Sequence, residues 1–316
     1  MGSIRGDAEG REPSGCPPGS KPRAAGRAEK RAAQAVTPGL YLVATPIGNL
    51  GDITLRALDV LRGVALIACE DTRVTGKLLA AYGIAARMTP YHEHNAEHAR
   101  PALIAKLTQG AAVALVSDAG TPLVSDPGYK LVRAALAAGI RVSVIPGASA
   151  VLAALTLAGL PSDRFLFAGF LPAKAGERKK TLSALAAVPA TLVLYETAPR
   201  LAASLADMAE LLGAREAAVA RELTKLFEEV RRGPLAELAR HYREAGPPKG
   251  ELVVVIAPPA AAAPADAATL DRMLEEALAR ASLRDAADAV AAASGLPRRR
   301  VYGRALELAK RRAAPA

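Results

Sequence analysis

The fold is decided by the segment Ser117-Asp118-Ala119-Gly120-Thr121-Pro122-Leu123-Val124-Ser125-Asp126-Pro127-Gly128 and, downstream of it, by Ile145-Pro146-Gly147-Ala148-Ser149-Ala150. Each segment follows a strand-like apolar run and precedes an Ala/Leu-rich run with helical character. Gly, Pro, Ser and Asp interrupt regular structure and let a ligand approach the backbone. The repeated order of strand, polar loop and helix predicts an open α/β sheet, which binds ligands at the carboxyl ends of its strands. We expect the carboxylates of Asp118 and Asp126 near the mouth of such a site.

Length and composition set broad limits on the protein. At 316 residues the chain is long enough for about two domains. Apolar residues make up 51% of it and aromatic residues only 3%, so the cores must be built from Ala, Leu and Val. The net charge of +10 is typical of a protein with a polyanionic partner or an anionic membrane surface, and it also serves solubility.

The cysteines and the apolar runs indicate in which compartment of the cell the protein works. Cys16 lies in a polar tail and Cys69 in an apolar run, so we expect neither a disulfide nor a metal site. The longest uncharged apolar stretch, 148–160, is too short to span a membrane. The N-terminus lacks the apolar core of a secretory signal. These features predict a cytoplasmic protein with no membrane partner.

Local composition divides the chain into five parts. Residues 1–38, rich in Gly, Pro, Ala and Arg, are predicted to be a disordered tail. Two α/β domains are expected over 39–160 and 161–258, followed by an Ala/Pro linker over 259–265. The last part, 266–316, is expected to be a small helical unit.

The helical unit has the pattern of a helix-turn-helix. Ser282 is the expected N-cap of one helix, with Asp285 at its third position. The segment Gly295-Leu296-Pro297 ends that helix, and a basic helix starts at Arg298. A solvated C-terminal helix explains the same pattern equally well.

Further motifs follow the expected strands of both domains. They are Leu42-Val43-Ala44-Thr45-Pro46-Ile47-Gly48-Asn49-Leu50-Gly51-Asp52-Ile53, Glu70-Asp71-Thr72-Arg73, Tyr91-His92-Glu93-His94-Asn95, Tyr195-Glu196, Arg221-Glu222-Leu223-Thr224-Lys225, Glu228-Glu229-Val230-Arg231-Arg232-Gly233 and Lys249-Gly250-Glu251. Together with the two loops quoted first, this set resembles the ribosomal RNA small subunit methyltransferase I family. That family is the ribose 2′-O-methyltransferase branch of the tetrapyrrole methylase superfamily. The resemblance covers about residues 38–257 and the helical unit.

The resemblance carries expectations about fold and function. It implies two α/β domains of the tetrapyrrole methylase type, with S-adenosylmethionine in the cleft between them, and a homodimer. It implies methylation of the ribose of a cytidine in 16S ribosomal RNA of the small subunit. One departure stands after Tyr195-Glu196: the family usually shows Ser-Pro-His-Arg, whereas this chain has Thr197-Ala198-Pro199-Arg200, so no histidine acts there.

The reaction calls for a proton acceptor. A ribose 2′-hydroxyl is a poor nucleophile, so a positioned base helps methyl transfer, which otherwise depends on alignment and exclusion of water. The candidates are carboxylates and imidazoles at expected strand ends: Glu70, Asp71, His92, Glu93 and His94. A hydrogen-bonded histidine loop, or a helix cap formed by Glu70 or Asp71, explains the same residues without catalysis.

Other residues are candidates for binding. For the donor we expect Pro46, Asp118, Gly120, Asp126, Ser149, Ala150, Tyr195 and Glu222, and for RNA Arg73, Lys77, Arg221, Lys225, Arg298, Arg299 and Arg300. Arg73 and Lys77 share one helix face, where they either grip phosphate or pair with Glu70 or Asp71. The run Arg178-Lys179-Lys180 is interpreted as a solvated helix face that also contacts RNA.

Alternative functions remain open from the sequence. The nearest is a tetrapyrrole C-methyltransferase of the same superfamily, which the Tyr91–Asn95 segment, the basic charge and the helical unit disfavour. A non-catalytic nucleic-acid-binding regulator would need no methyl donor. A nicotinamide dehydrogenase is the weakest alternative, because the glycine fingerprint of such enzymes is missing after the first strand.

Overall fold

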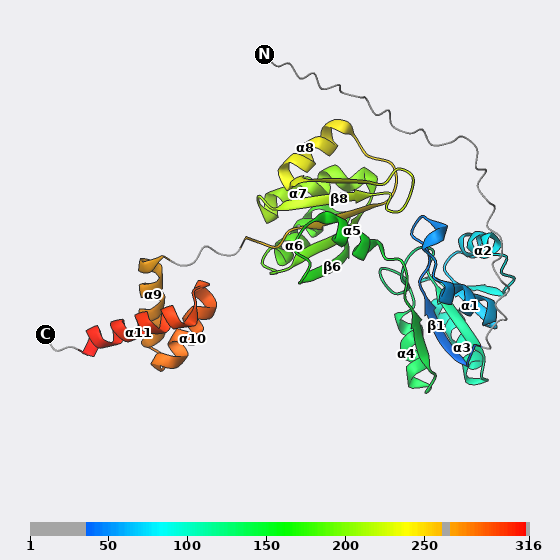
Figure 1. Ribbon diagram of the computed structural model, residues 1–316, viewed down its shortest axis with the longest axis horizontal. Helices are drawn as coiled ribbons and strands as arrows, with labels where there is room; N and C mark the ends of the chain where they lie inside the picture. Colours follow the sequence, from blue (N-terminus) through cyan, green and yellow to red (C-terminus); the bar gives the residue numbers. More distant parts are fainter. Residues whose placement is uncertain (1–35, 261–265, 314–316) are drawn as a thin grey trace, which may run out of the picture.

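The computed structural model describes residues 36–260 and 266–313 (Figure 1). Nearly all of the predicted tail, with Cys16, and most of the predicted linker lie outside these residues. Two five-stranded sheets, each covered by helices, are followed by a helical unit. The expected α/β class is therefore confirmed. None of the described helices is both long and apolar enough to cross a membrane.

The first sheet is wholly parallel, with the strand order β3-β2-β4-β1-β5. Its strands are β1 (Gly39–Val43), β2 (Leu66–Cys69), β3 (Met88–Pro90), β4 (Ala112–Val116) and β5 (Val142–Ile145), and its helices are α1 (Leu55–Gly63), α2 (Thr72–Ala81), α3 (Ala96–Thr108) and α4 (Tyr129–Ala137). Alternate residues of β1 face opposite cores, since Leu40 packs in one buried cluster and Tyr41 in the other. Because the strands are parallel, the loops after all five carboxyl ends meet along one edge of the sheet.

The second sheet is mixed, with the order β6-β7-β10-β8-β9. Its strands are β6 (Phe165–Phe170), β7 (Thr191–Glu196), β8 (Glu216–Arg221), β9 (Glu229–Pro234) and β10 (Leu252–Ile256), and its helices are α6 (Ala175–Leu185), α7 (Leu201–Leu212) and α8 (Leu235–Ala245). Only β6 and β7 pair in parallel. Helices α6, α7 and α8 share one apolar core with this sheet, through residues such as Leu182, Leu205 and Leu238.

Helix α5 (Ala150–Ala158) joins the two sheets. It follows β5 of the first sheet, yet its Ala154 and Leu155 pack in one cluster with Val193, Ala218 and Val253 of the second. The residue range expected for the N-terminal domain, 39–160, thus includes a helix whose apolar face belongs to the core of the other sheet. This helix fixes the loop before it, 146–149, between the two sheets.

Strand β9 is not predicted by the pattern of its sequence. Its sequence, EVRRGP, is charged and lacks apolar alternation. It lies at the edge of the sheet and pairs only with β8, so its charged side chains can remain in contact with water. Hydrogen bonding to a neighbouring strand, rather than burial, makes this segment a strand.

The C-terminal unit consists of α9 (Ala267–Leu278), α10 (Leu283–Ser294) and α11 (Arg298–Ala313). These helices share an apolar core that includes Leu274, Val290 and Val301. The Ser282 side chain accepts a hydrogen bond from the Asp285 amide, and Gly295 ends α10 in the left-handed region at φ 67°. The predicted N-cap and helix stop are both confirmed.

Candidate functional site

A cavity of about 440 Å³ lies where the loops of the first sheet meet the second sheet. Ile47, Gly120 and Ser149 line it from the first sheet's loops, and Tyr195 and Val253 from the second sheet. Most of the lining side chains are apolar or small. A cavity of this size and composition is typical of a small-molecule site.

The loops around the cavity are tied to one another. The amides of Thr45 and Gly120 exchange hydrogen bonds with each other's carbonyl groups at 2.9 and 3.0 Å. The Thr45 hydroxyl donates to the Ser117 carbonyl, and the Thr121 hydroxyl donates to the Ala148 carbonyl. The loops after β1, β4 and β5 therefore form one connected rim.

Backbone strain is concentrated in two loops that contribute to the cavity. Among the described residues, four that are not glycine have positive φ: Leu123 at 73°, Ser125 at 61°, Glu222 at 50° and Thr224 at 65°. Two belong to the loop 117–128 and two to the loop 222–228. Such conformations cost about 1–3 kcal/mol each, and they cluster at ligand sites because the surrounding structure must impose them.

Three carboxylates lie together at the carboxyl edge of the first sheet. Burial, together with the charges of Glu70 and Asp118, raises the pKa of Asp126 to about 6. Burial also raises the pKa of Glu70, with the charge of Asp118 as the next cause. We call Glu70, Asp118 and Asp126 the acidic cluster. Within the described part of the chain, no three His, Cys, Asp or Glu side chains are arranged to hold a metal ion.

An aromatic wall lies across the cavity from Asp126. The ring of Tyr195 contacts those of Phe167 and Phe170, with centroids 4.9 and 5.4 Å apart. Burial raises the pKa of the Tyr195 hydroxyl, and the charge of Asp126 is the next cause, so these two side chains lie close across the cavity. One side of the cavity thus offers negative charge and the other flat apolar surface.

The five candidates for a proton acceptor have different surroundings. Asp71 caps α2 and accepts from the Arg73 guanidinium, which lowers the pKa of Asp71 to about 2. Glu93 and His94 are exposed. The charge of His92 acts on Glu70, and the buried Nδ1 of His92 has no hydrogen-bond partner. Glu70 therefore belongs to the acidic cluster and His92 lies beside it, whereas the Asp71 carboxylate is occupied by Arg73.

The structure brings together most of the residues expected at the donor. Gly120, Asp126, Ser149, Ala150 and Tyr195 line the cavity. Pro46, Asp118 and Glu222 are not among its lining residues: Pro46 lies between Thr45 and Ile47, Asp118 accepts a hydrogen bond from the Asp71 amide, and Glu222 accepts from the Glu251 amide.

The cations expected to bind RNA are mostly paired within the chain. Arg73 pairs with Asp71, Arg221 with Glu229, Lys225 with Glu222 and Glu251, and Arg298 with Asp288. Lys77, Arg299 and Arg300 are exposed. Their exposure leaves these three side chains open to an external anion.

Sequence reasoning missed part of the cavity wall. Phe170, Leu223, Glu251, Leu252 and Val253 line it, yet none was a candidate. The available signal was the motif Lys249-Gly250-Glu251, whose glycine the structure explains: at φ +100° and in contact with Glu222, position 250 leaves no room for a side chain. Gly250 itself lines the cavity, just before β10 begins.

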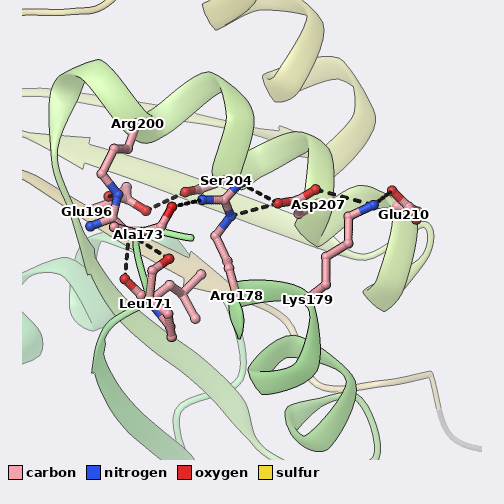
Figure 2. A network of polar contacts seen from close by, with 10 residues as sticks. Leu171, Ala173, Arg178, Lys179, Glu196, Arg200, Ser204, Asp207 and Glu210 are labelled. Atoms are coloured by element: carbon pink, nitrogen blue, oxygen red, sulfur yellow. Dashed lines mark hydrogen bonds and ion pairs between the residues drawn. The ribbon is translucent and has the colours of Figure 1, made fainter. Parts of the chain in front are cut away.

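A polar network (Figure 2) meets the cavity at Glu196, one of the lining residues. The Glu196 carboxylate, buried in the wall, accepts hydrogen bonds from the Ser204 hydroxyl and the Thr197 amide and pairs with Arg200 at 3.3 Å. Arg200 also donates to the Leu171 carbonyl. This network fixes the segment 197–199, which lines the cavity where the family motif departs, and places Pro199 in the wall.

The expectation of a solvated basic face on α6 is wrong for Arg178. This side chain is buried and donates to Asp207 at 2.6 Å and to the Ala173 carbonyl at 3.0 Å (Figure 2). Lys179 pairs with Glu210. The reason is that α6 packs against α7, so this part of the helix faces the protein and needs buried counter-charges.

The comparisons with known proteins agree with this geometry. The family model Tetrapyrrole (Corrin/Porphyrin) Methylases matches residues 39–239, and the model RsmI C-terminal HTH domain matches residues 264–309. Ribosomal RNA small subunit methyltransferase I of Mesorhizobium japonicum is 57% identical, covering 87% of this chain and 94% of that protein. The Erythrobacter litoralis protein of that name is 56% identical, covering 87% and 97%. Uroporphyrin-III C-methyltransferase from Thermus thermophilus has a TM-score of 0.50 at 26% identity, covering 69% and 94%.

Proposed function

We propose that this protein methylates a ribose 2′-oxygen, since the chain belongs to the ribosomal RNA small subunit methyltransferase I family of tetrapyrrole methylases. It is an S-adenosylmethionine-dependent ribosomal RNA methyltransferase. The proposed acceptor is cytidine 1402 of 16S ribosomal RNA. The observation that carries the proposal is a cavity of about 440 Å³ whose lining includes the carboxylate of Asp126, with Glu70 and Asp118 close enough to raise its pKa.

The residues that line the cavity suit the methyl donor. The apolar and aromatic wall, which includes Tyr195, suits an adenine ring, and the carboxylate of Asp126 suits a positively charged sulfonium and ammonium group. The small residues Gly120 and Ala150 leave backbone groups open to the ligand. When bound there, S-adenosylmethionine supplies an electrophilic methyl group. We assign Pro46, Asp118, Ser149 and Glu222 to the support of this site.

We assign proton removal to Glu70. As the 2′-oxygen forms its bond to the methyl carbon and the carbon–sulfur bond breaks, the hydroxyl proton passes to the Glu70 carboxylate. Burial and the charge of Asp118 raise the pKa of Glu70, which makes its carboxylate a better base. Asp71 is a weaker candidate because Arg73 holds its pKa near 2. His92, beside Glu70, is assigned to positioning it.

RNA contact is assigned to exposed cations. Arg299 and Arg300 on α11, together with Lys77 on α2, are exposed and suited to phosphate. With several phosphate contacts, the affinity for RNA should fall with salt at a log–log slope of about −0.7 to −0.9 per contact. Replacing Arg299 and Arg300 by alanine should make this slope shallower by about 1.5, which a filter-binding titration would measure.

We propose that the protein works in the cytoplasm as a homodimer. Large apolar side chains remain exposed on α5 and on the edge strand β6, namely Leu152, Phe165 and Leu166. Burial of such side chains against a second copy would remove them from water. Light scattering behind a sizing column tests this: a mass near twice 32.5 kDa supports the dimer, and a monomer at assay concentration contradicts it.

The function is tested with a methyl-labelled donor. Small ribosomal subunits from cells lacking this enzyme, and a uroporphyrinogen in a parallel reaction, are each incubated with protein and donor. The proposal predicts label in the 16S RNA and none in the tetrapyrrole. Label in the tetrapyrrole alone would overturn it in favour of a C-methyltransferase. Donor binding is measured separately, so that an inactive preparation is recognised.

A further inference from the structure

The loop 222–228 carries two large apolar side chains that point away from the protein. Leu226 is 90% exposed and Phe227 is 68% exposed, the largest and third largest values among the exposed apolar residues of the described chain. Three residues before Leu226, Leu223 is buried and lines the cavity. The apolar tip therefore projects from the mouth of the donor site.

The loop is held firmly despite its exposed tip. The amide of Thr224 donates to the Glu228 carboxylate at 2.7 Å, and the Glu228 amide donates to the Lys225 carbonyl at 3.1 Å. The Lys225 ammonium donates to Glu222 at 2.7 Å and to Glu251 at 3.1 Å. Glu222 and Thr224 both have positive φ, so this loop is strained as well as tied. The loop holds Leu226 and Phe227 in water at the cost of backbone strain, which indicates that a ligand covers these two side chains.

The loop also contacts the first α/β domain. A side chain at Gly48 would lie 2.4 Å from Cγ of Lys225, so Gly48 permits a close approach between the loop after β1 and the loop 222–228. Gly48 follows Ile47, which lines the cavity. Leu226 and Phe227 thus stand where the two domains meet beside the donor.

The charges around the tip disfavour phosphate as its ligand. Lys225 is paired with two glutamates and Arg221 with Glu229, so the cations nearest the tip are already neutralised. What remains free is apolar surface with one aromatic face. Such a surface suits the flat face of a nucleobase, which stacks on aromatic side chains without regard to sequence.

We propose, on the basis of the proposed function, that Leu226 and Phe227 form a wedge that stacks on RNA bases beside the target nucleotide and holds its ribose at the donor. A 2′-hydroxyl within stacked RNA cannot enter a cavity between two domains unless its nucleotide leaves the stack. An apolar wedge beside the cavity fills the gap that the displaced nucleotide leaves. Phe227 supplies the stacking face and Leu226 the supporting contact.

The first test compares kinetics of matched variants. Phe227→Ala should lower kcat/KM for small subunits by about tenfold to a hundredfold, whereas Phe227→Tyr should restore most of it. Donor affinity, measured by calorimetry, should stay within twofold, because neither side chain lines the cavity. Leu136→Ala removes a side chain of comparable exposure, 59%, from the far end of α4 and should have no effect.

The second test locates the wedge directly. The chain has no tryptophan, so Phe227→Trp and Leu136→Trp each introduce one. Emission from position 227 should be quenched by small subunits and unchanged by protein concentration, whereas position 136 should respond to neither. If subunits do not quench position 227 while the wild type methylates them, the wedge is refuted and the function stands. Emission that changes with protein concentration alone would instead assign the tip to contact with a second copy.

Discussion

The two α/β domains each hold a group of buried or half-buried carboxylates, and the two groups have different partners. In the second domain, Glu196 and Asp207 are buried and each is matched by arginine, serine or lysine (Figure 2). In the first domain, none of the ion pairs among the described residues involves the acidic cluster. Burial and like charge raise the pKa values of Glu70 and Asp126, although the charge of His92 opposes the rise at Glu70. Perturbed carboxylates beside a cavity are candidates for chemistry, whereas buried ion-paired carboxylates stabilise the fold, and on this ground we assign the acidic cluster to the reaction.

The largest expected effect is a loss of activity on substitution in the acidic cluster, which the ion-paired carboxylates of the second domain should not show. Glu70→Gln should lower kcat by about a hundredfold to ten-thousandfold, because the amide cannot accept the hydroxyl proton. The thermal midpoint and donor affinity should remain near those of the wild type. The matched control is Glu93→Gln, since Glu93 is exposed and lies outside the cluster. Equal activity of the two variants would remove Glu70 from the reaction.

The second effect is a loss of stability on substitution of an ion-paired carboxylate in the second domain. Asp207→Ala leaves the buried Arg178 guanidinium without its partner, which should lower the free energy of unfolding by about 3–5 kcal/mol. Denaturant titration measures this loss, and the activity per folded molecule should be unchanged. Glu210→Ala, which breaks an exposed pair with Lys179, should cost about 0–1 kcal/mol. If both variants lose the same stability, the burial of Arg178 is not what matters.

A smaller loss is expected at the wall of the cavity. Ser204→Ala deletes the hydroxyl that donates to buried Glu196, at a cost of about 1–3 kcal/mol in the free energy of unfolding. Because Glu196 anchors the segment 197–199, donor affinity should fall slightly as well. Thermal denaturation with and without donor reports both quantities. A variant as stable as the wild type would show that Arg200 and the Thr197 amide satisfy Glu196 without the hydroxyl.

The smallest expected effect is a pH dependence in the acidic cluster. Asp126 ionises near pH 6 in the folded chain and near its ordinary 3.8 when unfolded. Between these values the folded state binds more protons, so the free energy of unfolding falls as pH rises from 4 to 6. Asp126→Asn removes this fall and should be the more stable protein above pH 6 in the absence of donor.

Thermal midpoints of Asp126→Asn and the wild type from pH 4 to 8 measure this difference. The groups that face Asp126, namely Glu70, Asp118 and Tyr195, are present in both proteins. Midpoints that differ by a constant amount at every pH would show that Asp126 is not perturbed by burial. Donor affinity of the wild type should rise over the same range, because an ionised Asp126 attracts a cationic donor.

The sequence predicted the first sheet and its polar edge well, for a physical reason. Parallel strands bring the ends of distant segments together, so polar loops after buried strands define a site without knowledge of packing. This is how Gly120, Asp126 and Ser149 could be grouped as neighbours. The same logic does not extend to antiparallel strands, and the cavity wall at Leu252 and Val253 was missed. It also does not find β9, a charged edge strand that only its pairing defines.

The sequence also could not predict which side chains pair with one another. The sequence could not tell whether Arg178 and Lys225 face water, because that depends on how α6 packs on α7 and where Glu251 lies. Asp71 was weighed both as a base and as a helix cap, and it does cap α2. Likewise, Tyr195 and Asp126 belong to different domains, and neither local sequence indicates that the two side chains lie close together.

The central claim is that the protein methylates a ribose 2′-oxygen, and the chemical position of the transferred methyl group tests it most directly. RNA labelled by the wild-type protein is hydrolysed in alkali, which cleaves only where the 2′-hydroxyl is free. The account predicts that the label is recovered in an alkali-resistant dinucleotide that begins with cytidine. Label recovered in a mononucleotide would place the methyl group on a base and contradict it.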